Sequence, residues 1–291
     1  MTKTEEHERD VDALLAAWAS SGEAAPLADY LAANSNLPGP RGNLELADAF
    51  ARAVARYSAT DADAVWGLSR SLAAITADVA PTNDPCEFVA FAGVRGIAAI
   101  AAVNPPRRPA AFKRLLEAAV DRRWRVREAV AMGLQDLIAA DAPIAIEELW
   151  GWLKADARLS GDSPLPDDAP LSGDDPLTLR AVIAGVAEPR LLKDPDTARA
   201  ALDLHRAVAK RLAATPLEER RTDGFKALRK GLGYSISVVA AALPEPGFEL
   251  LETLTGSDDP DVRWVVKENL KKARLVRVDA ERVARLAKRL T

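Results

Sequence analysis

The chain has 291 residues, of which 48% are apolar and only 5% aromatic, and the apolar content is mostly Ala, Leu and Val. This composition suits packed helices better than a β-sandwich. The formal charge of −4 disfavours a dedicated nucleic-acid-binding domain, and the single cysteine, Cys86, excludes an intramolecular disulfide. No apolar leader and no 18-residue apolar run occurs, so we expect a cytoplasmic protein without membrane contact.

Residues 1–9 are polar and predict a tail. Beyond them, apolar residues at helical spacing, bounded by Pro, Gly, Asn or Asp, predict a series of helices. We interpret residues 1–104 as an N-terminal helical region, made of degenerate repeats or a cap. Its expected helices cover 11–18, 26–33, 44–57, 61–75 and 86–102.

Residues 105–291 contain two clear helical hairpins, at 109–139 and 246–275. Further helices are expected at 144–155, 177–186, 197–214, 222–242 and 279–290, with a break near Gly231–Gly233. Residues 157–176 contain the string LSGD twice and are rich in Asp, Pro, Gly and Ser. Such a segment cannot bury enough apolar surface to fold, so we predict an acidic, mobile loop.

One sequence pattern appears twice: residues 112–134 match residues 248–270 at an offset of 136. Each copy consists of an apolar helix, a polar turn and a second apolar helix that opens on Val-Arg. This is typical of a helical-pair repeat. The matched pairs are Phe112 and Phe248, Leu115 and Leu251, Val126 and Val262, Arg127 and Arg263, Val130 and Val266, and Leu134 and Leu270.

The turn Asp259–Arg263 is similar to the inter-helix turn of HEAT repeats, in which an acid precedes a Val-Arg pair. An offset of 136 corresponds to three units of about 45 residues, inside the range of HEAT and armadillo repeats. The resemblance implies an all-α fold, namely an α-α superhelix of irregular HEAT-like hairpins over residues 105–291. It also implies a scaffold that binds partners along an extended surface.

The positions that the two copies do not share are the candidate partner-binding residues. Around Trp124, basic residues flank an aromatic ring, a pattern that can serve nucleic-acid backbone contacts and base stacking. In the last hairpin, basic residues at i, i+4, i+8 and i+11 from Arg263 predict one stripe opposite the buried face, which would face an acidic partner or phosphates if the second helices line the concave surface. The candidates are Arg122, Arg123, Trp124, Arg125, Lys267, Lys271 and Arg274.

These basic residues also have a plainer interpretation, a solvated helix face with Trp124 packed on the next unit. For the shared Arg127 and Arg263, we favour a structural ladder in which each arginine bonds an acid or a helix-end carbonyl of a neighbouring unit. Residues 261–291 hold ten Lys/Arg against four Asp/Glu, so the end of the chain is basic.

The sequence contains no catalytic constellation that we can identify. Its only histidines are His7 and His205, and neither has a second metal-ligating residue close by in sequence. Cys86 has no histidine partner nearby, and no nucleophile elbow, P-loop or dinucleotide fingerprint occurs. We therefore predict neither an enzyme, nor a metal site, nor a cofactor.

Two functions remain open. The first is a non-enzymatic scaffold that binds a protein or peptide on its concave surface. The alternative is a nucleic-acid-binding protein of the HEAT-like DNA glycosylase type, which the net charge disfavours. Neither the partner nor the oligomeric state follows from the sequence. The loose candidates for the glycosylase-type alternative are Trp124, Trp150, Trp152, Arg127 and Asp136.

Overall fold

The computed structural model describes residues 2–154 and 175–290, and these residues form helices and loops without a strand. The fold is therefore all-α, as the composition predicts. The acidic loop expected at 157–176 lies outside the described residues, apart from Asp175 and Pro176, which cap and begin a helix. Within the described ranges, no helix has the length and apolarity needed to cross a membrane.

The chain divides into two compact units, Met1–Asp141 and Ala142–Thr291. The boundary expected near residue 104 lies inside the first unit. The reason is that the helix ending at Val103 packs on both of the helices that follow it.

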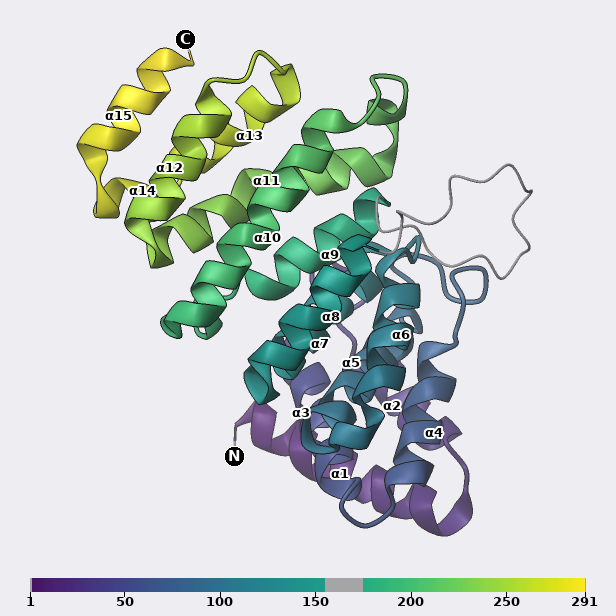
Figure 1. Cartoon of the computed structure of the whole chain (residues 1–291). Helices are drawn as coiled ribbons and strands as arrows, with labels where there is room; N and C mark the ends of the chain where they lie inside the picture. Colours follow the sequence, from purple (N-terminus) through teal and green to yellow (C-terminus); the bar gives the residue numbers. More distant parts are fainter. Residues whose placement is uncertain (1, 155–174, 291) are drawn as a thin grey trace. The chain divides into compact units, whose positions relative to one another are not determined.

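In the first unit, successive helices alternate between two packed layers (Figure 1). Helices α1, α3, α5 and α7 are neighbours in one layer. Helices α4 and α6 pack on α5 from the other layer, and α2 contacts α1 and α5. The bounds are α1 (Lys3–Ser21), α2 (Ala25–Ala33), α3 (Leu44–Tyr57), α4 (Ala62–Ala73), α5 (Glu87–Val103), α6 (Arg108–Ala119) and α7 (Trp124–Ala140).

The second unit is built in the same way. Helices α9, α11 and α13 are neighbours in one layer, α10 and α12 pack on α11, and α14 and α15 close the chain. The bounds are α8 (Ala142–Lys154), α9 (Pro176–Val186), α10 (Pro195–Ala214), α11 (Asp223–Ala242), α12 (Pro244–Thr255), α13 (Pro260–Leu270), α14 (Ala273–Val278) and α15 (Ala280–Arg289).

The two units repeat one arrangement of helices. Helices α6 and α7 begin at residues 108 and 124, and α12 and α13 begin at 244 and 260, so the offset of 136 holds for both pairs. Helices α4 and α10 keep the same offset. The buried positions 65, 66, 68, 69 and 72 of α4 correspond to the buried positions 201, 202, 204, 205 and 208 of α10.

Helices α5 and α11 are related by a different offset, 139. Gly96 of α5 packs against Ser69 of α4. The equivalent contact in the second unit joins Ser235 of α11 to His205 of α10, with 2.9 Å between the serine oxygen and Nε2. A three-residue 3₁₀ turn, Pro105–Arg107, follows α5 in the first unit, and it restores the offset of 136 before α6 begins.

The chain start differs from the prediction of a polar tail, because α1 already begins at Lys3. Thr2 and Glu5 form a capping box, in which each side chain bonds the backbone N–H of the other residue. This reciprocal cap satisfies two N–H groups that would otherwise lack partners, and it explains why a polar segment is helical.

The break expected near Gly231–Gly233 is also absent, since α11 is continuous. The second glycine is needed for packing rather than for a turn. A Cβ at Gly233 would lie 2.9 Å from the Trp264 ring, so only glycine lets that ring lie against α11.

Candidate functional site: an apolar pocket and an ionic row on the first unit

An apolar pocket of about 280 Å³ opens on the first unit, where the loop between α2 and α3 meets α5 and α7. Its apolar wall consists of Leu44 at the start of α3, Phe91 of α5, and Trp124 and Met132 of α7. Leu44 and Trp124 are exposed, whereas Phe91 is buried. Concave apolar sites with a few polar groups are the usual form of a binding site.

Trp124 is the most unusual member of this wall, because 41% of this large apolar residue is exposed. Its orientation is fixed from below by Arg125, whose guanidinium carbon lies 4.4 Å from the centre of the indole ring. A cation over the ring face stabilises this arrangement. The pocket therefore presents an aromatic surface that is held in place before any ligand binds.

Arg125 is itself buried and held by three acceptors from different segments. Its guanidinium donates to Glu87 of α5 at 2.9 Å, to Asn83 Oδ1 at 2.9 Å, and to the Gly39 carbonyl oxygen. Glu87 is fully buried and also accepts the Asn83 N–H at 2.8 Å. This network joins the α2–α3 loop, the α4–α5 loop and α7, and so it fixes the shape of the pocket.

An ionic row lies one helical turn beyond the apolar wall. Asp48, Arg95 and Asp136 follow Leu44, Phe91 and Met132 by four residues each, so they share the same helix faces. The Arg95 guanidinium donates to Asp48 at 2.9 Å and to Asp136. Arg95 is almost entirely buried, whereas 43% of the Asp48 side chain is exposed.

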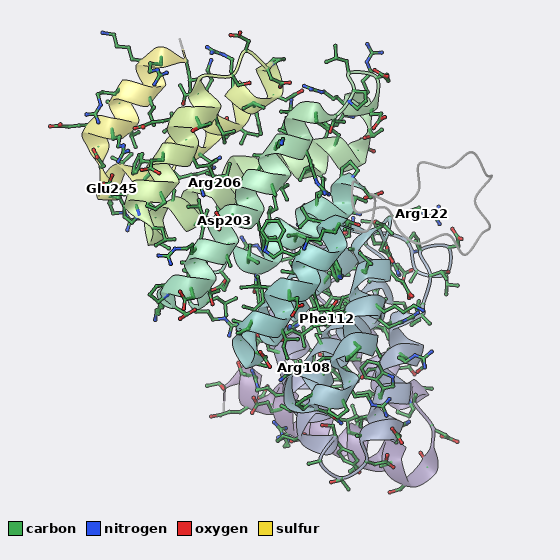
Figure 2. All side chains as sticks on the ribbon, in the orientation of Figure 1. Arg108, Phe112, Arg122, Asp203, Arg206 and Glu245 are labelled. Atoms are coloured by element: carbon green, nitrogen blue, oxygen red, sulfur yellow. The ribbon has the colours of Figure 1, made fainter. Side chains whose placement is uncertain are left out.

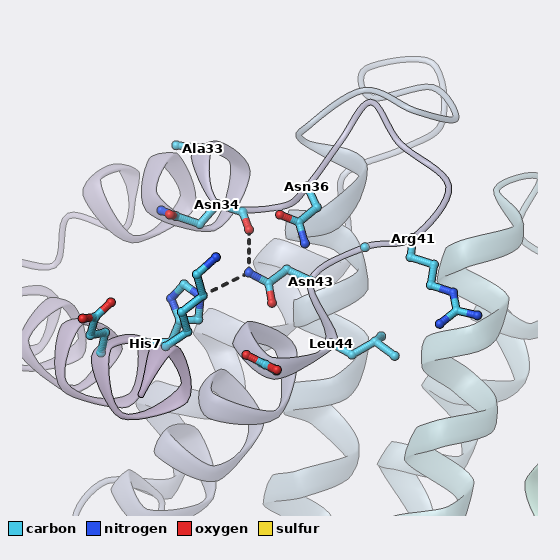
Figure 3. A pocket seen from close by; sticks show the side chains of 11 residues that line it. His7, Ala33, Asn34, Asn36, Arg41, Asn43 and Leu44 are labelled. Carbon is cyan, nitrogen blue, oxygen red and sulfur yellow. Dashed lines mark hydrogen bonds between the residues drawn. The ribbon is translucent and has the colours of Figure 1, made fainter. Parts of the chain in front are cut away.

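A polar cavity of about 600 Å³ adjoins the pocket and shares Arg41, Gly42 and Leu44 with it. Figure 3 shows its floor, where the Asn43 side-chain amide donates to the Asn34 carbonyl oxygen at 2.9 Å and lies 3.2 Å from His7 Nε2. The Asn43 oxygen accepts the Leu46 N–H and caps α3. These bonds fix the floor of the cavity without closing it.

Beside this cavity, His7 Nδ1 lies 2.9 Å from the Tyr30 hydroxyl, which donates to Asp10 at 3.2 Å. Burial, with the nearby Asp10 carboxylate, raises the pKa of Tyr30 to about 12. The phenol is therefore protonated at neutral pH and acts as a structural donor.

Two of the predicted binding residues, Trp124 and Arg125, line the pocket, and two neighbours do not. Arg123 is only 1% exposed and donates to the carbonyl oxygens of Ile75 at 2.7 Å and Ala80 at 3.2 Å, so it fastens the loop that precedes α5. Arg122 is exposed at the turn between α6 and α7 and forms an ion pair with Asp78 (Figure 2).

The basic stripe predicted for the last hairpin does not form on one helix. Helix α13 ends at Leu270, Lys271 is its C-cap residue, and α14 starts at Ala273, which is exposed rather than buried. Lys267 is exposed, and Lys271 pairs with Glu268 at 2.5 Å. Arg274 instead reaches α11, where it donates to the Tyr234 hydroxyl at 2.8 Å.

The two arginines expected to form a ladder have different partners. Arg263 donates to the Leu290 carbonyl oxygen at 3.1 Å, at the end of α15. Arg127 donates to the carbonyl oxygens of Asp121 and Arg122, in the turn that precedes its own helix.

The loose candidates for glycosylase-type chemistry are divided between the two units. Trp150 and Trp152 belong to the second unit, and Trp152 is buried. Asp136 belongs to the first unit, where it pairs with Arg95.

Sequence reasoning missed the ionic row and most of the apolar wall. The available signal was an apolar residue followed four positions later by a charged one, repeated at Leu44, Phe91 and Met132.

The fully buried His205 is placed for packing, and burial lowers its pKa to about 4. Cys86 is exposed. Burial also raises the pKa of the Cys86 thiol, the opposite of an activated nucleophile. Among residues 2–154 and 175–290, no three His, Cys, Asp or Glu residues are grouped so as to hold a metal ion. The geometry of the pocket suits non-covalent binding.

No protein-family model matches the chain, and no curated protein does. Among solved structures, the chain is similar to an engineered protein, at 17% identity over 95% of this chain and 97% of that one, with a TM-score of 0.36. Two designed armadillo repeat proteins match at 15% and 16% identity, each over 84% of this chain and 98% of theirs, with TM-scores of 0.27. One of them was solved in complex with the peptide (KR)4. At these scores the likenesses identify neither a family nor a function.

Proposed function

We propose that the first unit is a non-enzymatic scaffold that binds an extended peptide segment of a partner protein. In this proposal, an apolar side chain of the peptide enters the pocket and contacts Trp124. The observation that carries it is the exposed indole, held by Arg125 above an apolar wall. Rigid aromatic side chains in such positions supply much of the binding energy at protein interfaces.

The ionic row suggests the next feature of the peptide. It lies four residues along each helix from the apolar wall, a displacement of about 6 Å. In an extended peptide, residues i and i+2 share a face and lie about 6.7 Å apart. A basic residue two positions from the apolar anchor would therefore reach the exposed Asp48 carboxylate. The preferred motif is apolar-x-basic.

The charge of the first unit supports a peptide rather than a nucleic acid as the ligand. Residues 1–141 contain 19 Asp/Glu and 15 Lys/Arg. Nucleic-acid binding draws most of its free energy from neutralising phosphates with Lys and Arg. The net negative charge of this unit opposes it, and this ranks the DNA glycosylase type second. We retain the HEAT resemblance as an interpretation of how the hairpins are built.

The test uses 5-fluorotryptophan-labelled protein, in which the Trp124 resonance is assigned with the Trp124→Phe variant. Two nonapeptides of equal composition carry Leu and Arg in a Ser/Gly background, either two positions apart or adjacent. We expect the first peptide to shift the Trp124 resonance at submillimolar concentration and to bind about fivefold tighter than the second. The spaced pair shares one face of an extended chain, whereas the adjacent pair does not.

The Trp124→Ala variant should weaken binding of the first peptide at least tenfold. Trp18→Ala is the matched control, because Trp18 is a half-buried tryptophan on α1 that lines neither cavity. If neither peptide perturbs Trp124 at millimolar concentration, the proposed peptide site is wrong. Equal affinity for the two peptides would refute the motif but not the pocket.

A further inference from the structure

We propose that the face of the second unit formed by α9, α11 and α13 binds an acidic segment of a partner protein. This surface is separate from the pocket of the first unit, and either can exist without the other. We call it the cationic face and define it by Arg180, Lys230, Lys267, Lys271, Lys272 and Arg274. Tyr234 lies at its centre.

The cationic face is the counterpart of the peptide groove proposed for the first unit. With the offsets of 139 for α5 and 136 for α7, the apolar wall residues Phe91 and Met132 correspond to Lys230 and Glu268. In the ionic row, Arg95 and Asp136 correspond to Tyr234 and Lys272. The two pairs also make equivalent contacts in the structure. Arg95 pairs with Asp136 in the first unit, and at the corresponding positions of the second unit Lys272 Nζ lies 5.6 Å from the Tyr234 ring centre.

Direct contacts join these residues into one surface. Gly231 of α11 lies under Arg180, because a Cβ there would be 3.4 Å from the arginine Cγ. Tyr234 is 51% exposed, and the Arg274 guanidinium carbon lies 4.6 Å from its ring centre. Lys230 precedes Tyr234 by one turn and shares its face. The surface therefore runs from α9 across α11 to α14.

The fold does not need these cations. Lys230 and Lys267 are exposed, and neither has an ion-pair or hydrogen-bond partner within the described ranges. The first unit builds the same layer with Phe91 and Ala131 at the equivalent positions. Glu268 lies among these cations and already pairs with Lys271. A net positive surface on which Lys230 and Lys267 have no packing role matches an acidic ligand.

The aromatic rings favour a peptide over a nucleic acid as that ligand. Single-stranded nucleic acids stack their bases on open ring faces. Here Trp264 lies against Gly233 and carries the Arg229 guanidinium 4.5 Å from its ring centre. Tyr234 carries Lys272 and Arg274. Carboxylates need no free ring and bind the cations directly.

The test measures fluorescence anisotropy of a labelled dodecapeptide of alternating Glu and Ser at low salt, with the full chain. We expect binding that weakens as salt is raised, and a loss of about fivefold in the double variant Lys230→Gln, Lys267→Gln. The matched control is Lys193→Gln, Lys210→Gln, which removes the same charge from exposed positions outside this layer. Unchanged thermal unfolding shows that both doubles are folded.

Equal weakening in the two double variants would overturn the proposal, because it would show attraction by net charge alone. Tighter, Lys230-dependent binding of a labelled 12-nucleotide single strand would overturn the assignment to an acidic peptide. Residues 157–174 include four aspartates and could compete with the added peptide. The same measurement is therefore repeated with a variant that lacks these residues. If its affinity for the Glu/Ser peptide rises, that acidic stretch competes for the face, and if neither form binds, the proposal fails. The pocket test on Trp124 is unaffected by either result.

Discussion

Replacing Arg125 by methionine tests the physical basis of the candidate pocket. The substitution removes a buried cation that contacts Glu87, Asn83 and the Gly39 carbonyl oxygen, and it leaves the fully buried Glu87 carboxylate without its counter-charge. Removing one partner of a buried ion pair costs about 3–5 kcal/mol. We expect Arg125→Met to destabilise the first unit by that amount.

The companion variants separate the uncompensated charge from the lost packing. Glu87→Gln alone leaves the Arg125 charge buried and should also cost several kcal/mol. In the double variant Glu87→Gln, Arg125→Met no buried charge remains, so its cost should be at least about 2 kcal/mol smaller than the sum of the singles. A glutamine at position 87 can still accept the Asn83 N–H.

The assay is native-state hydrogen exchange of α5 and α7 at increasing urea, because a chain of two units need not unfold in one step. Peptides from α11 and α13 serve as the internal reference for the second unit. A cost below about 1 kcal/mol for Arg125→Met, or additive costs in the double variant, would refute the account of the network. Arg125→Met should also weaken Leu/Arg peptide binding, because it releases Trp124.

Three further predictions concern the framework. The pKa of His205 is about 4 in the folded state and 6.5 in the unfolded state, so between these pH values only the unfolded state takes up the proton. The free energy of unfolding, measured with urea, should therefore fall by about 3 kcal/mol between pH 6.5 and 4. The His205→Gln variant should show a flatter dependence on pH. Gly93→Ala should cost about 1–3 kcal/mol in thermal unfolding, because its Cβ would meet the backbone of α4, whereas Gly67→Ala, with open space around it, should be neutral or stabilising. Asp259→Ala removes the N-cap of α13 and an ion pair to the largely buried Arg220, and it should cost about 2 kcal/mol in urea unfolding.

The all-α architecture was predictable because it depends on features that are local in sequence. Helical spacing of apolar residues, with Pro, Gly or Asp at the ends, placed most helices close to their observed bounds. The last hairpin was expected to run to 275, whereas α13 ends at Leu270. Two other boundaries failed for reasons that lie outside that signal. The start of α1 depends on the reciprocal bonds of Thr2 and Glu5, and the continuity of α11 depends on Gly233 packing against Trp264.

The duplication of the whole unit was less visible, because the offset between the copies changes. It is 136 for α4, 139 for α5 and 136 again for α6 and α7, because the turn Pro105–Arg107 after α5 restores the first offset. The contact of Ala98 with Gly133 in the first unit corresponds to the bond from the Ser237 N–H to Asn269 in the second. A comparison at one fixed offset detects the part from 112 to 134 and misses α5, although α5 is the most buried helix of its unit.

The site was hidden for a related reason. Its ionic row is spaced 47 residues from Asp48 to Arg95 and 41 from Arg95 to Asp136, so no constant period connects its members. They are connected because α3, α5 and α7 are neighbours in one layer and each places its ionic-row residue one helical turn beyond its apolar wall residue, on the same side of the layer. In the second unit this turn presents Tyr234 and Lys272, which preserve a contact between α11 and the end of α13 while changing its chemistry. Packing therefore constrains where these residues lie but not what they are, and this difference in chemistry is the basis on which different ligands are proposed for the two units.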